Sequence, residues 1–305
     1  MDDFNGRSVI IFNKNGEFIR RIPNGQGPGE LVRLYDIAFD YEKNELIAYQ
    51  NSFLLFFSPT GEFLRQERLP FGFYNFTVIP NGYIFKTLDR RGNGHLGDFQ
   101  DYTLLITDKT FKINSVGLPF SPIENVIHEY DYVMNNSKCV NITQAYTDTV
   151  YQYVDTLGQF RAKFSLVYGD KKLPKQYLHS KTYAEFDDVI RNNDYYFYNG
   201  RYLETNTHNV FFLENYNIGR TVIFRNKQSG NLIGGINALY NNNEIPPIAF
   251  PISAFKNALI ASYLPSKNDS FIEKSSKISD MDKKKIKGLT EDDNPVLVFY
   301  ELKNF

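Results

Sequence analysis

One recurring phrase constrains the fold of this chain more than any other feature. Its first copy, at residues 8–19, reads SVIIFNKNGEFI, and its second copy, at residues 53–64, reads FLLFFSPTGEFL. The glycines of these copies, Gly16 and Gly61, lie 45 residues apart, which is the spacing of propeller blades. Each copy combines an apolar run, a polar turn and a second run, so it predicts a β-hairpin.

Weaker copies extend the pattern along the chain. They lie at 102–113, 148–160 and 220–232, and a half-copy ends the chain at 294–303. Two further strand-like runs lie between successive copies, so each unit has four antiparallel strands, named a to d, and the phrase covers c and d. Four-stranded units at this period predict a β-propeller, whereas a helical solenoid would need 3.6-residue patterning. A β-sandwich is the other all-β alternative.

The strand count leaves both ends of the chain incomplete. Only seven residues precede the first hairpin, too few for strands a and b, and the last unit lacks strand d. We therefore expect a truncated, six-bladed β-propeller of four-stranded antiparallel blades with an incomplete N-terminal blade, formed by residues 1–305 as a single domain. The alternative is a five-bladed ring closed by the N-terminal hairpin.

Composition argues against several classes of function. The aromatic share of 16%, with 27 Phe and 22 Tyr, favours strands. A formal net charge of −1 gives no field that would attract nucleic acid. No run approaches the roughly 20 apolar residues of a membrane-spanning helix, and no signal peptide is visible. Cys139 is the single cysteine, which excludes an internal disulfide, and we interpret it as a small buried hydrophobic residue.

The lengths of the connections predict which end of the blades carries function. In an up-and-down sheet the a–b and c–d turns lie at one end, and the b–c and d–a connections lie at the other. The turns of the first set are short, and the second set contains the long insertions, at 23–33, 89–101, 167–194 and 265–294. Long loops gathered at one end are where functional residues usually lie. Two insertions also predict short helices, at 175–190 and 279–289.

Two of these insertions supply most of the candidate ligand-binding residues. The loop 24–30, NGQGPGE, has glycines that permit a tight turn, and we expect Glu30 to accept hydrogen bonds from its amides. Phosphate binding is disfavoured there because no Lys-Ser/Thr pair and no helix follow. Segment 89–98 is the richest polar cluster, and we expect a flexible glycine-rich loop with ordinary surface charges there. The alternative is a site in which Arg90 and Arg91 bind a carboxylate or sugar acid, with His95 and Asp98 beside them. The candidates are Gln26, Glu30, Arg90, Arg91, His95, Asp98 and His128.

The phrase at 12–22, followed by the loop at 25–30, resembles the uncharacterised NHL-like six-bladed β-propeller proteins of Bacteroidetes, and the end at 292–298 is similar to that family as well. The resemblance spans nearly the whole chain. It implies a lipoprotein signal and about a blade of sequence that this chain lacks, and hence a location in the cell envelope or periplasm. It supplies no established activity and no catalytic residues.

The histidines do not predict a metal site by their spacing. None of the four lies within ligand distance of another along the sequence, and no HExxH or GxSxG motif is present. Related propeller lyases and lactonases place His, Glu and Asp around a central metal, and His128 with Glu129 and Asp131 is the best local match. We expect no cofactor, with a divalent cation in the channel as the alternative.

We therefore predict a non-catalytic binding or scaffold propeller. It would be a monomer that uses its loop-decorated face for a protein or glycan partner, because abundant Tyr and Asn suit such contacts. The alternative is a metal-dependent NHL-type lyase or hydrolase with its site at the channel mouth. An enzyme of that kind would bring at least three of His, Asp and Glu together.

Overall fold

The computed structural model describes residues 2–3, 8–87, 91–120, 133–136, 139–179, 182–236, 251–263, 272, 276, 278–290, 296–303 and 305. The chain divides into two compact units. Unit 1 comprises residues 1–128, 133–142 and 150–164, and unit 2 comprises residues 129–132, 143–149 and 165–305.

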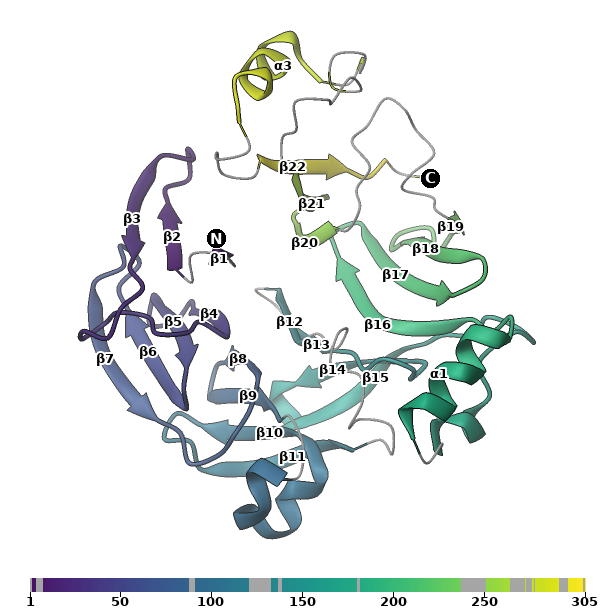
Figure 1. The fold of residues 1–305 in the computed structure, drawn as a ribbon, viewed down its shortest axis with the longest axis horizontal. Helices are drawn as coiled ribbons and strands as arrows, with labels where there is room; N and C mark the ends of the chain where they lie inside the picture. Colours follow the sequence, from purple (N-terminus) through teal and green to yellow (C-terminus); the bar gives the residue numbers. More distant parts are fainter. Residues whose placement is uncertain are drawn as a thin grey trace. The chain divides into compact units, whose positions relative to one another are not determined.

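Unit 1 is built from antiparallel sheets whose strands are neighbours in chain order (Figure 1). Its described strands form one three-stranded sheet, β1–β3, and three four-stranded sheets, β4–β7, β8–β11 and β12–β15. The strands are β1 (Asp2–Asp3), β2 (Ser8–Phe12), β3 (Phe18–Ile22), β4 (Asp36–Asp40), β5 (Glu45–Gln50), β6 (Phe53–Phe57), β7 (Phe63–Arg68), β8 (Asn75–Ile79), β9 (Gly82–Lys86), β10 (Tyr102–Asp108), β11 (Ile113–Pro119), β12 (Val133–Asn136), β13 (Cys139–Ile142), β14 (Thr149–Val154) and β15 (Gln159–Ser165).

Unit 2 continues the same construction. Among its described residues, one sheet has four strands and a second sheet has three, all antiparallel. The four-stranded sheet contains β16 (Phe197–Glu204), β17 (His208–Asn215), β18 (Gly219–Asn226) and β19 (Leu232–Ile236). The three-stranded sheet contains β20 (Pro251–Phe255), β21 (Ala258–Tyr263) and β22 (Val296–Glu301).

Successive four-stranded antiparallel sheets of this kind are the blades of a β-propeller. The chain is accordingly an all-β propeller with four-stranded antiparallel blades, and the fold prediction is confirmed at this level. The expectation of six blades is wrong: only four sheets among the described strands have four strands, and this count agrees better with the five-bladed alternative. The first sheet gains only the two-residue strand β1, and the last sheet has no described strand beyond β22.

The continuous apolar runs of the strands are explained by burial on both faces of a sheet. On β6, Leu54 and Phe56 face the β8–β11 sheet, whereas Leu55 and Phe57 face the β1–β3 sheet. Strands β9 and β10 divide their side chains between their two neighbouring sheets in the same way. Because both faces are buried, the polar–apolar alternation of a half-exposed strand is absent.

The recurring phrase encodes a capped turn between strands c and d. In the first copy, Asn13 Oδ1 accepts hydrogen bonds from the backbone N–H groups of Asn15 and Glu17, at 2.9 and 3.0 Å. Gly16 then takes the left-handed conformation, with φ of 83°. The equivalent caps in the later copies are Ser58, Asp108 and Asn226.

The third copy has lost the glycine but keeps its backbone conformation. Phe111 stands in its place with φ of 66°, a conformation that L-residues rarely adopt. Its side chain is buried in the core between the β4–β7 and β8–β11 sheets. The turn geometry is therefore retained by the sheet packing even where the glycine is absent.

The long connections join b to c or d to a, as predicted. The β9–β10 connection contains the 3₁₀ segment η1 (Arg91–Asp101), and the β15–β16 connection contains η3 (Lys175–His179) and α1 (Tyr183–Asn192). The β21–β22 connection contains α3 (Asp280–Lys287), which begins after Ser279, whose Oγ accepts a hydrogen bond from Asp282 N at 3.1 Å. Both predicted helices are confirmed. Among the described residues, no helix has the length and apolar character needed to span a membrane.

Candidate functional site

The loop between β3 and β4 is closed by its own glutamate. Glu30 Oε2 accepts a hydrogen bond from Gly27 N at 2.8 Å, as expected. Gly25 passes so close that a Cβ on it would lie 2.0 Å from the same oxygen, and Gly29 has φ of 77°. The glycines thus serve the turn and the internal contact of the loop. Gln26, by contrast, is exposed.

The segment expected to be a flexible glycine-rich loop instead contains 3₁₀ turns from residue 91, named η1, with non-helical backbone at Asn93 and Gly97. Asn93 is only 2% exposed, donates from Nδ2 to Gly72 O at 2.9 Å and accepts at Oδ1 from Gly72 N at 2.8 Å. His95 Nε2 donates to Pro70 O at 2.6 Å. These three bonds fix η1 to the β7–β8 connection, which offsets the backbone freedom of its glycines.

The other predicted residues fall in different places. Asp98 is exposed on η1. Arg90 and His128 lie outside the described residues, as does the side chain of Arg91. Within the described part of unit 1, no hydrogen bond or ion pair joins Gln26 or Glu30 to η1. A common ligand site formed by the seven candidates therefore stays a prediction.

A cation–aromatic pair in the β3–β4 connection was missed by the sequence reasoning. Tyr35 lies directly before β4 and is 43% exposed, and the Arg33 guanidinium lies 4.9 Å from the centre of its ring. The Tyr35 ring also packs 5.2 Å from the buried ring of Tyr49. Tyr49 is held in turn by a hydrogen bond from its hydroxyl to Phe73 O, at 2.9 Å. A buried support of this kind positions the exposed ring before any ligand arrives.

Burial also raises the pKa of the supporting tyrosine. Desolvation, with a smaller contribution from Tyr35, raises the pKa of Tyr49 to about 12. Its hydroxyl therefore remains a hydrogen-bond donor at neutral pH. The sequence signal that could have revealed the pair is the spacing of Arg33 and Tyr35, since residues i and i+2 of an extended segment share one side.

Unit 2 carries a pair of the same construction. Tyr216, in the β17–β18 connection, is 44% exposed, and the guanidinium of Arg191 on α1 lies 4.8 Å from the centre of its ring. The Tyr216 ring packs 5.8 Å from the buried ring of Phe197. The Nε of Arg191 also donates to Asp187 Oδ2 at 2.6 Å, which restricts its rotamers. Both pairs lie in b–c or d–a connections.

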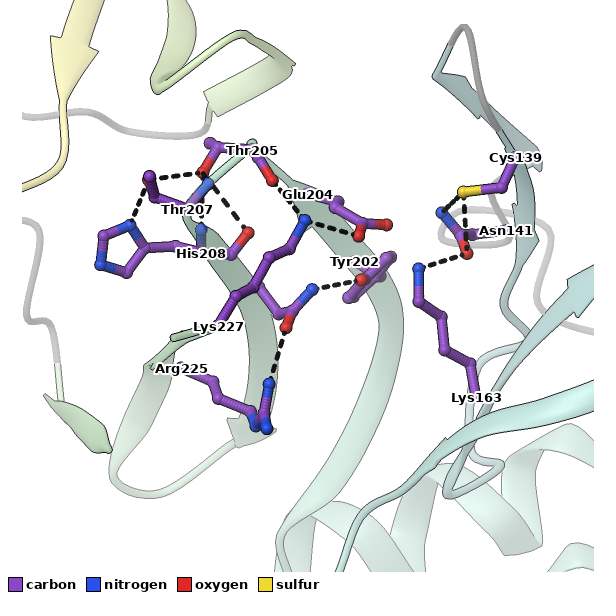
Figure 2. Close-up of polar contacts among 11 residues, drawn as sticks. Cys139, Asn141, Lys163, Tyr202, Glu204, Thr205, Thr207, His208, Arg225 and Lys227 are labelled. Atoms are coloured by element: carbon purple, nitrogen blue, oxygen red, sulfur yellow. Dashed lines mark hydrogen bonds and ion pairs between the residues drawn. The ribbon is translucent and has the colours of Figure 1, made fainter. Parts of the chain in front are cut away.

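Unit 2 also contains a polar network around the β16–β17 turn (Figure 2). Lys227 Nζ forms an ion pair with Glu204 at 2.7 Å and donates to Thr205 O at 2.5 Å. The buried His208 contacts Thr207 Oγ1 through Nδ1 at 2.9 Å, and its Nε2 has no partner among the described residues. Burial, with the charge of Lys227, lowers the pKa of His208. The network therefore stabilises the β16–β17 turn and contains His208 in its neutral form.

Unit 1 contains a cavity at the short-turn end of its sheets, where no site was expected. It has a volume of about 240 Å³. It is lined by the β4–β5 turn, the β8–β9 turn, β13 and the end of β14. Cys139 lies in its wall and is half-buried, so its interpretation as a buried hydrophobic residue is wrong. The amide of Asn141 donates to its sulfur at 3.6 Å, and Lys163 donates to the same amide at 3.0 Å (Figure 2).

A metal ion in a protein is usually held by at least three side chains of His, Cys, Asp or Glu. In the ranges that the structure describes, no three of these residues gather closely enough to hold a cation. The residue proposed from the sequence as the best metal ligand, His128, lies outside these ranges.

Comparison with known proteins gives a family and a fold. A family model described as a domain of unknown function, DUF4934, matches residues 1–301. No curated relative matches the sequence. The solved structure of a candidate exported protein from Bacteroides fragilis is similar with a TM-score of 0.77, at 17% identity over 99% of this chain and 87% of that chain. The structure of U3-55K has a TM-score of 0.44, at 10% identity over 84% of this chain and 68% of that chain.

Proposed function

The chain belongs to the DUF4934 family, a domain of unknown function. We propose that it is a non-catalytic binding module. It would bind a protein partner at the ends of its blades that carry the long b–c and d–a connections. The sequence was expected to resemble an uncharacterised family of propeller proteins, and membership of DUF4934 confirms that it belongs to an uncharacterised family. The assignment to NHL-like propellers stays a prediction. One observation supports the binding role above all: each unit presents an exposed Arg–Tyr pair on these connections.

Arginine and tyrosine are, with tryptophan, the residues enriched among those that dominate the binding energy of protein interfaces. A tyrosine ring gives a large contact area with few rotatable bonds, and an arginine above it presents several donors. In this chain the exposed rings of Tyr35 and Tyr216 each rest on a buried ring. The entropy cost of ordering them is therefore met by the fold, which leaves more of the contact energy for the partner. The exposed side chains of Val32, on the β3–β4 connection, and Phe99, on η1, add apolar area.

The setting of this module is part of the same proposal. Residues 1–305 form one propeller domain that acts as a monomer. The module works in the cell envelope or periplasm, and the name of the similar Bacteroides fragilis protein, a candidate exported protein, supports this placement.

The test compares partner capture by variants of the two pairs. Immobilised protein is incubated with an extract of the cells that produce it, and the bound proteins are quantified by mass spectrometry. We expect Tyr35→Ala or Tyr216→Ala to reduce capture of one partner by ten-fold or more, because hot-spot truncations cost about 2 kcal/mol or more.

The matched control is an exposed cation–aromatic pair at the short-turn end. Phe255 lies beside the β20–β21 turn and is exposed, with Lys256 Nζ 5.3 Å from the centre of its ring. Phe255→Ala should leave capture unchanged. The proposal fails if no protein is enriched by the unsubstituted chain, or if all three variants lose it equally.

A further inference from the structure

The cavity in unit 1 combines an apolar floor with an acidic edge. Buried side chains of Val78, Ile79 and Val140 form the floor. Glu42 and Asp155 also line the cavity, and both residues are exposed. Among the described residues neither carboxylate forms an ion pair or accepts a hydrogen bond, so both are available to a ligand.

A third acid lines the cavity but is already neutralised. Asp40 is buried, and its Oδ2 accepts a hydrogen bond from Lys109 Nζ at 2.9 Å. Its Oδ1 accepts from the backbone N–H groups of Glu42 and Lys43, at 3.0 and 3.1 Å. Because these bonds use both oxygens, Asp40 shapes the β4–β5 turn, and the negative charge that faces the cavity comes from Glu42 and Asp155.

Tyr153 adds a hydrogen-bonding group to the lining of the cavity. It lines the cavity, is only 8% exposed, and packs 5.3 Å from Phe160. Its hydroxyl has no hydrogen-bond partner in the part of the chain that the structure describes. Burial, and secondarily the charge of Asp155, raises the pKa of Tyr153, so the hydroxyl stays protonated at neutral pH. The hydroxyl oxygen is not among the fully enclosed polar atoms of the described residues that lack a partner, so it is open to a ligand that can accept its hydrogen bond.

From this combination we infer that the cavity binds a small organic cation, an amine or guanidinium carried on a short apolar body. The apolar body would lie on the floor of the cavity, the cation between Glu42 and Asp155, and a polar atom of the ligand against the hydroxyl of Tyr153. The cavity volume of about 240 Å³ exceeds the roughly 150 Å³ of an apolar cavity that binds benzene. It is below the approximately 300 Å³ at which sites for drug-sized ligands begin.

Two sources can present this chemistry: a free metabolite, or a lysine or arginine side chain of a protein. The site lies at the opposite end of the sheets of unit 1 from the Arg33–Tyr35 pair, because the short turns and the long connections leave a blade at different ends. Its occupation therefore does not depend on the partner surface proposed above.

The test is a pair of nearly isosteric probes that differ in charge. Binding of n-butylguanidinium and of neutral N-butylurea to the full chain is followed by NMR titration. We expect n-butylguanidinium to bind at least ten-fold more tightly, the ratio that one charge-assisted contact in a partly shielded site provides. A third probe, acetyl-Gly-Arg-Gly-amide, distinguishes the sources: its binding would assign the site to a side chain, and its exclusion would assign it to a free cation.

Three substitutions locate the binding. Asp155→Asn or Glu42→Gln should lower the affinity for n-butylguanidinium several-fold and leave that for N-butylurea unchanged, and Tyr153→Phe should weaken both. Glu62→Gln is the matched control, since Glu62 is an exposed carboxylate on the β6–β7 turn, outside the cavity. The inference is overturned if neither probe binds, if the two probes bind equally, or if the control has the same effect as Asp155→Asn.

Discussion

Phe111 offers a direct test of how the turns of this propeller are stabilised. It has the left-handed backbone, with φ of 66°, that Gly16 and Gly61 have in the first two copies. Its ring is 8% exposed and packs 5.5 Å from the ring of Tyr83. Truncating a buried phenylalanine to alanine costs about 3–5 kcal/mol. That exceeds the roughly 1–2 kcal/mol by which a left-handed conformation disfavours a side chain, so the ring explains why the strain is tolerated.

The perturbation compares Phe111→Ala with Phe111→Gly. Both variants lose the buried ring, but only glycine relieves the backbone strain of about 1–2 kcal/mol. Glycine in turn gives the unfolded chain more freedom, which offsets about 0.4–1 kcal/mol of this gain. We therefore expect Phe111→Gly to be more stable than Phe111→Ala by about 0.5–1 kcal/mol, although both are less stable than the unsubstituted chain.

Urea unfolding measures this difference. The transition is followed by tyrosine fluorescence, since the chain has 22 Tyr and no Trp. The control pair is Ile84→Ala and Ile84→Gly on β9, where the backbone is not left-handed and the order should reverse, with glycine the less stable by about 0.5–1 kcal/mol. If Phe111→Ala is as stable as Phe111→Gly or more stable, the left-handed backbone at this turn is not strained. The explanation that burial of the ring offsets such strain would then be wrong.

Two further measurements test the close packing of the sheets and the buried histidine. Gly82→Ala would place a Cβ 1.7 Å from Thr107 O, so we expect a loss of about 3 kcal/mol or more in urea unfolding. Gly92→Ala, with nothing within 4 Å of its Cβ, should change little, and equal losses would exclude the contact as the cause. The second measurement concerns His208, whose pKa in the folded chain is lowered by burial and by the charge of Lys227. As the pH falls, His208 is therefore protonated in the unfolded chain, near pH 6.5, before it is protonated in the folded chain. The free energy of unfolding should therefore fall as the pH drops from about 7 to 5. His208→Gln should make the free energy of unfolding depend less on pH in this range. If the pH dependence is the same in this variant, His208 is not its cause.

Much of the fold could be predicted because the blades repeat a local pattern. The caps at Asn13 and Ser58 and the glycines that follow them act within one turn, so they are visible as a short phrase. The number of complete blades could not be predicted in this way. The two-residue strand β1 has no periodicity to recognise, and its existence depends on its pairing with β2.

The candidate site was less predictable because its contacts join distant parts of the chain. Asn93 looked like one polar residue among glycines, and nothing in its surroundings indicates that it bonds Gly72, 21 residues away. The cavity is formed by turns and strands of three different sheets, so neither Cys139 nor Tyr153 has a local signature there. The Arg33–Tyr35 pair did have a local signal, but its importance depends on the buried ring of Tyr49 beneath it.

The hydrogen bonds between Asn93 and Gly72 have a consequence for motion at the loop-bearing end of unit 1. Because the side chain of Asn93 both donates to and accepts from Gly72, η1 and the β7–β8 connection cannot separate unless these two bonds break together with the bond from His95 to Pro70. The two segments therefore share one opening equilibrium instead of two independent ones. Exchange of the Gly72 amide hydrogen with solvent should accordingly report the undocking of η1, a segment to which Gly72 does not belong.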